Sequence, residues 1–150
     1  QWDPVKTAGG YLLVAGAGDT LRGSLNGIFY TDASTSKPTW ANHLAASNTA
    51  TDIVGFVSDD PYERFEIQSN NTGASAVTDV GKTADLEYTA GSSPDYISKV
   101  ELNDSTLNTT AQQLKIMGIS KDPDNDDTAS ANVNWVVIIG EHELTVATGT

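Results

Sequence analysis

The apolar residues of this chain fall in short segments rich in β-branched and aromatic side chains, separated by Gly, Ser, Thr, Asn and Asp. Short punctuated segments of this kind are typical of β-strands. No segment keeps a 3.6-residue apolar period over three turns, which argues against a long amphipathic helix. We therefore predict an all-β chain, with strands at residues 11–15, 27–30, 52–57, 65–68, 114–119 and 133–139.

Two of these segments also predict which side chains are buried. In residues 65–68, Phe65 and Ile67 alternate with polar residues, which predicts one buried and one exposed face. Residues 133–139 begin with alternation and then become wholly apolar, as expected of a central strand covered on both sides. The strongest patterns together predict a core of Phe56, Phe65, Ile67, Ile116, Trp135, Val137 and Ile139.

These strands predict a single β-domain over residues 1–150, either a compact β-barrel or a β-sandwich, with an N-terminal arm over about residues 1–8. Residues 31–50 and 70–96 are read as two long polar loops. Loops longer than about 12 residues are usually functional or ordered by a partner, so this pair favours a surface made for binding. A short helical turn is expected near residues 105–113, capped by Ser105 or Thr106.

Composition excludes several kinds of function. The chain has no cysteine, which rules out thiol catalysis and cysteine-based zinc sites. Its 20 acidic and 8 basic residues give a net charge of −12, and such a surface repels the phosphate backbone of nucleic acids. No apolar run is long enough to cross a membrane as a helix. We therefore expect neither nucleic acid nor membrane as a partner.

Candidate metal sites match their motifs only in part. Asp122–Asp127 (DPDNDD) has acids where a calcium loop begins, but lacks the Gly at its sixth position and the Glu at its twelfth. Pro123 favours a simple turn instead. His142 lies between two glutamates without the spacing of a metalloprotease motif, so we expect a surface histidine on a terminal strand.

No catalytic motif emerges either. The four acids of the segment SDDPYERFEIQ (residues 58–68) could supply an acid–base pair of the glycosidase kind, but Pro61 and Tyr62 indicate an exposed turn leading into a strand. No Gly-x-Ser-x-Gly elbow is present to carry a serine nucleophile. We therefore expect no enzymatic activity, no catalytic residue, no metal and no cofactor.

Several stretches, taken in order, resemble a family of virion proteins from tailed bacteriophages. They read DPV, GIFYTDASTSKPTW, DIVGFVSDDPYERFEIQ, DVGKTAD, ISKVELNDSTLNTTAQQLKIMGISKDPDN and VVIIGEHEL, and extend from Asp3 to Leu144. The order and spacing of the blocks carry the resemblance, since no single block is specific. One position departs from the pattern: Gly140 stands where the family usually has Asn before the final Glu-His.

The resemblance implies a structural protein of the phage head, namely a decoration (cement) protein on the outside of the capsid. Its partners would be the major capsid protein and further copies of itself, with a trimer favoured. Alternatives are another virion component, such as the base of a head fibre, and a carbohydrate-binding β-sandwich that stacks sugars on Trp40, Tyr30 or Trp2. The interface residues we expect are Trp2, Asp3, Tyr30, Trp40, His43, Tyr88 and Tyr96.

Overall fold

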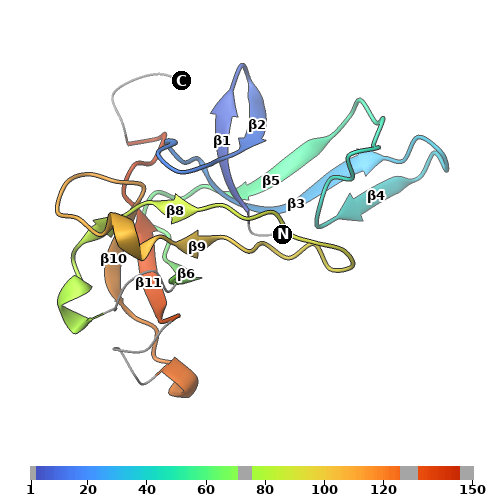
Figure 1. Cartoon of the computed structure of the whole chain (residues 1–150). Helices are drawn as coiled ribbons and strands as arrows, with labels where there is room; N and C mark the ends of the chain where they lie inside the picture. Colours follow the sequence, from blue (N-terminus) through green and yellow to red (C-terminus); the bar gives the residue numbers. More distant parts are fainter. Residues whose placement is uncertain (1–2, 71–75, 126–131, 146–150) are drawn as a thin grey trace.

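The computed structural model of this chain describes residues 3–70, 76–125 and 132–145, and its regular structure is all-β (Figure 1). The described residues contain no α-helix, only the short 3-10 turns η1 (Val77–Asp79), η2 (Asp104–Thr106) and η3 (Pro123–Asn125). Its strands are β1 (Pro4–Ala8), β2 (Tyr11–Val14), β3 (Gly23–Thr31), β4 (Pro38–Ala41), β5 (Val54–Ser58), β6 (Phe65–Gln68), β7 (Thr83–Ala84), β8 (Leu86–Glu87), β9 (Glu101–Leu102), β10 (Leu114–Ile119) and β11 (Asn134–Ile139).

One sheet has five strands in the order β2-β1-β3-β4, with β5 on the other edge of β3. The hairpin of β1 and β2 closes through Gly9 and Gly10, whose φ angles of 57° and 84° suit a tight two-residue turn that most side chains would strain. Strand β3 is the central strand of this sheet. It pairs with β1 near its start, with β4 near its end and with β5 along most of its length.

A second sheet has four strands in the order β6-β11-β10-β7, and a two-stranded ribbon of β8 and β9 lies beside it. Strand β11 lies inside this sheet, and its Trp135, Val137 and Ile139 are buried while the residues between them are half-buried. These side chains form one core with Leu21, Leu86, Leu102, Leu114 and Ile116. Neither sheet closes on itself, which fits a sandwich better than a barrel.

A buried glutamine joins the two parts of the fold. The side-chain N–H of Gln113, which is 0% exposed, donates to the carbonyls of Gly16 (2.7 Å) and Asp19 (2.8 Å). Its side-chain oxygen accepts from the backbone N–H of Leu86 at 3.1 Å. The loop after β2, the start of β10 and strand β8 are therefore fixed to one side chain whose polar groups are satisfied, as a buried amide requires.

Burial differs from the sequence prediction at Phe56 and along strand β11. Phe56 is not part of the core, because 45% of it is exposed. Strand β11 is buried on one face, not on both. The prediction for β6 is confirmed: Phe65 and Ile67 pack against the core, and Glu66 and Gln68 are exposed. Ile116, Trp135, Val137 and Ile139 are buried as predicted.

The predicted loops and the predicted N-terminal arm contain strands. The two long loops contain regular structure, since β4 lies in the first and η1, β7 and β8 lie in the second. Residues 4–8, expected in an arm, form β1 inside the five-stranded sheet. The helical turn is the 3-10 turn η2, and its cap is Asn103, whose side chain accepts from the N–H of Ser105. No helix in the described part of the chain is long and apolar enough to cross a membrane.

Replacing Trp135 tests the core directly. Trp135 is 1% exposed, so Trp135→Ala should lower the free energy of unfolding by about 3–5 kcal/mol through lost burial and an unfilled cavity. Tyr62→Ala is the control, because Tyr62 is 81% exposed and its loss should change the value by less than about 0.5 kcal/mol. Urea unfolding followed by circular dichroism measures both. Equal midpoints for Trp135→Ala and the parent chain would contradict the assignment.

Candidate functional site

Strands β3, β4 and β5 carry a set of large apolar side chains on one face of their sheet. Residues directly opposite each other in paired strands share a face, and Phe29 of β3 lies opposite both Trp40 of β4 and Val54 of β5. Phe56 stands two residues after Val54 on the same strand, so it projects to the same side. Phe29, Trp40, Val54 and Phe56 are 40%, 54%, 52% and 45% exposed. We call these residues the aromatic face.

Two members of this face contact each other across the sheet. The rings of Trp40 and Phe56 are tilted at 50°, with centroids 4.9 Å apart. The six-membered ring of Trp40 lies over Gly27, where an added Cβ would come within 2.4 Å of Cζ2. Gly27 therefore leaves the space that the indole occupies, and the ring is held against the sheet with about half of its surface in solvent.

The opposite face of the same strands is covered. Ile28 alternates with Phe29 and is only 4% exposed. Leu12 of β2 packs over Gly55, the strand partner of Ile28. The aromatic face is thus the more exposed side of this part of the sheet.

The aromatic face continues into a pocket between the two sheets. Val54, Phe56 and Ser58 alternate along β5, and Ser24, the partner of Ser58, lines the pocket. The pocket has a volume of about 340 Å³. Its other walls include Phe65, Ile67, Leu114, Val137 and Ile139 from the four-stranded sheet. One surface of the five-stranded sheet therefore lines this pocket near the start of β3 and is about half exposed at the aromatic face, where β3, β4 and β5 extend beyond β6, β10 and β11 (Figure 1).

The turn that joins β3 and β4 is organised by Asp32. Its carboxylate accepts from the N–H and hydroxyl groups of Ser34 and Thr35 at 2.6–3.0 Å. The Ser34 hydroxyl, followed by the Thr35 donors, lowers the pKa of Asp32 to about 2, so the carboxylate is ionised at neutral pH. Asp52, which lies just before β5, accepts from the Thr31 N–H at 3.1 Å. The Thr31 donors also lower the pKa of Asp52. These bonds fix the end of the aromatic face.

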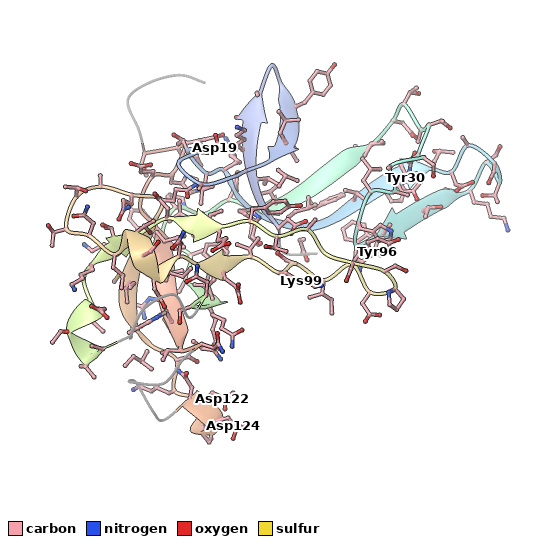
Figure 2. The ribbon with its side chains drawn as sticks, in the orientation of Figure 1. Asp19, Tyr30, Tyr96, Lys99, Asp122 and Asp124 are labelled. Atoms are coloured by element: carbon pink, nitrogen blue, oxygen red, sulfur yellow. The ribbon has the colours of Figure 1, made fainter. Side chains whose placement is uncertain are left out.

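A second aromatic contact attaches the β8–β9 connection to the end of β4. The rings of His43 and Tyr96 are stacked, with centroids 3.9 Å apart and planes at 14°. The side-chain amide of Asn42 also donates to the carbonyl of Asp95 at 3.2 Å. Figure 2 shows Tyr96 and Tyr30 at the same end of the molecule, whereas Asp122 and Asp124 lie well away from them.

The structure brings only some of the predicted interface residues together. Trp40 lies on the aromatic face, Tyr30 on the opposite face of β3, and His43 with Tyr96 just beyond β4. Asp3 and Tyr88 are half-buried and lie elsewhere: Tyr88 packs against the core, and its pKa is raised by burial and by the Asp3 charge. Trp2 lies outside the described residues.

Sequence reasoning missed Phe29 and Val54 and placed Phe56 in the core. Their signal is present in residues 27–30, where Ile28, Phe29 and Tyr30 are consecutive and must put apolar side chains on both faces of a strand. A strand pattern reveals that both faces are apolar, but not that one of them lacks a cover.

The candidate metal sites have structural roles in the described residues. Asp122 accepts from the N–H of Asp124 within the turn η3, and the side chain of Asn125 bonds backbone groups of Ser120 and Asn134, so this part of DPDNDD is a turn between β10 and β11. Asp126 and Asp127 lie outside the described residues. Within the described residues, no group of three His, Asp or Glu side chains is placed to hold a metal ion.

His142 is buried, contrary to the prediction of a surface histidine. It is 0% exposed, and its Nδ1 accepts from the N–H of Leu144 at 3.1 Å. Burial, followed by the nearby charge of Arg22, lowers its pKa below the ordinary value of 6.5, and Asp59 and Glu143 oppose that shift. The neutral imidazole is therefore the form that fits the fold.

Comparison with known proteins adds no relative: no family model, curated protein or solved structure matches this chain. Its function must be argued from its own residues.

Replacing Gly27 tests how Trp40 is seated. In Gly27→Ala the new methyl meets the indole, so the ring must move, at a cost of about 1–3 kcal/mol in stability. Gly118→Ala is the control, because nothing lies within 4 Å of a Cβ at that position. The indole N–H resonances of a ¹H–¹⁵N spectrum, assigned with Trp40→Phe, report the change. An unmoved Trp40 resonance in Gly27→Ala would contradict the contact.

The buried His142 predicts a loss of stability in mild acid. The unfolded chain binds a proton at His142 near pH 6.5, whereas the folded chain binds it only at lower pH because burial lowers the pKa. The contribution of His142 to the free energy of unfolding is therefore fully present above about pH 7. It decreases as the pH falls below 6.5, by at most about 1.4 kcal/mol per pH unit. Urea unfolding at pH 7.5 and 5.5 should show a larger loss for the parent chain than for His142→Gln. Equal losses would contradict the prediction.

Proposed function

We propose that this chain is a noncatalytic structural protein of a bacteriophage head, a decoration protein that binds the outer surface of the capsid through its aromatic face. The observation that carries the proposal is this face: Phe29, Trp40, Val54 and Phe56, all at least 40% exposed, lie side by side on one side of a sheet. Contiguous exposed apolar patches of this kind mark binding surfaces.

The composition of the face suits a protein partner. Three of its four members are aromatic, and aromatic residues are enriched among the side chains that dominate interface energies. Covering the exposed half of each side chain is worth roughly 1–2 kcal/mol at ordinary transfer energies. The ring of Trp40 is already held in place by its contacts with Gly27 and Phe56, so this side chain loses little freedom on binding.

The charge of the chain and the resemblance of its sequence support the place on the head. A net charge of −12 is repelled by packaged DNA, which suits the outside of a capsid better than its interior. The blocks from DPV to VVIIGEHEL resemble virion proteins of tailed phages in their order and spacing. The proposed partner is the major capsid protein. A trimer of this chain, as the resemblance implies, is part of the same proposal.

One observation favours a second candidate, a carbohydrate-binding module. The ring of Trp40 lies over Gly27 with 54% of the residue exposed, a geometry in which a sugar ring can stack. The neighbours of that ring on the same face are Phe29, Val54 and Phe56, none of which offers a side-chain hydrogen bond to a hydroxyl group. A protein surface therefore fits this face better than a sugar does.

Co-sedimentation with heads tests the proposal. Heads purified without this protein are mixed with the parent chain, with Trp40→Ser and with Phe56→Ser, and the bound fraction is measured at matched salt. Each variant should weaken binding at least tenfold, the equivalent of about 1.4 kcal/mol, because each removes a ring from the interface. Tyr62→Ser is the matched control, since it removes an aromatic that is 81% exposed in the turn before β6.

The outcomes separate the candidates. Circular dichroism should show that all three variants keep the fold, because the residues they change are exposed. If heads bind Trp40→Ser and Phe56→Ser as strongly as they bind the parent chain, the proposed docking face is wrong. Specific binding of the parent chain to glycans, lost in Trp40→Ser, together with no binding to heads, would support the carbohydrate module instead.

A further inference from the structure

The outer edge of β2 is open and apolar. β2 ends the order β2-β1-β3-β4, and no strand of the described residues pairs with its outer side. Its four residues, Tyr11, Leu12, Leu13 and Val14, are 76%, 36%, 48% and 47% exposed. An exposed apolar edge strand is a template for pairing with another strand.

The hydrogen bonds of β1 show which backbone groups of β2 face outward. The Thr7 N–H donates to Glu143 at 2.6 Å, and the Val5 carbonyl accepts from the Arg22 N–H at 2.7 Å, so these groups point away from β2. Hydrogen-bonded and non-hydrogen-bonded pairs alternate in an antiparallel ladder. Leu12 and Val14, the partners of Thr7 and Val5, therefore point their N–H and C=O groups away from β1.

This edge differs from the other open edges in its lack of charge. Residues 9–18 contain no charged side chain, although the chain carries a net charge of −12. The edge of β5 has Asp52 and Asp59 close to its two ends, and β4 begins with Pro38 after Lys37. Charges and proline are the usual devices that block strand pairing, and β2 has neither.

We propose that β2 pairs with β2 of a second copy of this chain, antiparallel and across a twofold axis at Leu13. In this register Leu12 lies opposite Val14 of the second copy and Val14 opposite its Leu12, so both outward-facing residues of each strand exchange hydrogen bonds. A strongly acidic chain approaches its own copy with least repulsion where the strand is uncharged. The pairing is independent of the aromatic face and joins two copies whether or not each belongs to a larger oligomer.

The contact is small, which sets its strength. A stable interface usually has about 20–30 residues on each side, many more than one strand of four residues supplies. Pairing in solution is therefore weak and rises with protein concentration. On a surface that holds copies close together the effective concentration is high, and the same contact becomes populated.

Single cysteines test the register, because the chain has none of its own. In Leu13→Cys the two sulfurs meet at the twofold axis, where Cα atoms of a non-hydrogen-bonded pair are about 4.5 Å apart, within reach of a disulfide. Tyr11→Cys is the matched control on the same strand and face. Two copies of residue 11 would lie about 14 Å apart along the strands, beyond that reach. Mild oxidation of concentrated protein, followed by nonreducing gel electrophoresis, should show a dimer for Leu13→Cys and little for Tyr11→Cys.

A charge at the same position gives a second readout. In Leu13→Glu a carboxylate faces Lys6 within the chain, which preserves the hairpin, but also faces its own copy across the axis. Sedimentation equilibrium should show at least tenfold weaker self-association than for the parent chain, whereas Val77→Glu, a change at an exposed residue of η1, should leave it unchanged. Cross-linking that is absent, or equal at positions 11 and 13, would overturn the proposal, as would unchanged self-association of Leu13→Glu.

Discussion

The exposed surface of this protein arises because strands β3, β4 and β5 extend beyond the four-stranded sheet (Figure 1). One surface of the five-stranded sheet faces Phe65 and Val137 across the pocket near Ser24 and then continues to Phe56 and Phe29, which are 45% and 40% exposed. The burial that the hydrophobic effect gives Trp135 and Ile116 therefore does not extend to the side chains of Phe56 and Phe29. These side chains form an apolar surface that strands β3 and β5 hold in shape and that is about half exposed to solvent.

Local polar contacts keep this uncovered part of the sheet ordered. Asp32 satisfies the donors of the β3–β4 turn, and Asp52 binds the last residue of β3. The stacked rings of His43 and Tyr96 attach the β8–β9 connection to the end of β4. A surface arranged in this way is ready for a partner without first having to fold. That property suits the proposed binding to a capsid, where affinity rises when ordering costs are low.

The sequence predicted the all-β class and most of the long strands, because alternation and β-branched residues determine these locally. It could not predict β7, β8 or β9, which have only two residues each and form through contacts with distant segments. It placed Phe56 in the core and His142 at the surface for a related reason. A strand pattern reveals which side chains share a face, whereas whether another layer covers that face depends on tertiary packing.

The candidate site was predictable to a similar degree. Trp40 was expected at an interface and lies on the aromatic face, but its neighbours Phe29 and Val54 come from strands read only as structural. Grouping them requires the register of β3 with β4 and β5, which no single segment contains. The glycine beneath Trp40 belongs to the same class of feature, since Gly27 is one of 13 glycines and only the packed sheet shows what it accommodates.

Hydroxyl-radical footprinting of the protein bound to heads tests whether the aromatic face is the docking surface, because it reads side-chain exposure residue by residue without any substitution. Oxidation of Phe29, Trp40 and Phe56 should fall strongly when the chain is bound, while oxidation of Tyr62, which is 81% exposed in the free chain, should stay the same. Unchanged oxidation of the three rings on bound protein would show that the uncovered part of the sheet is not where this chain meets the head.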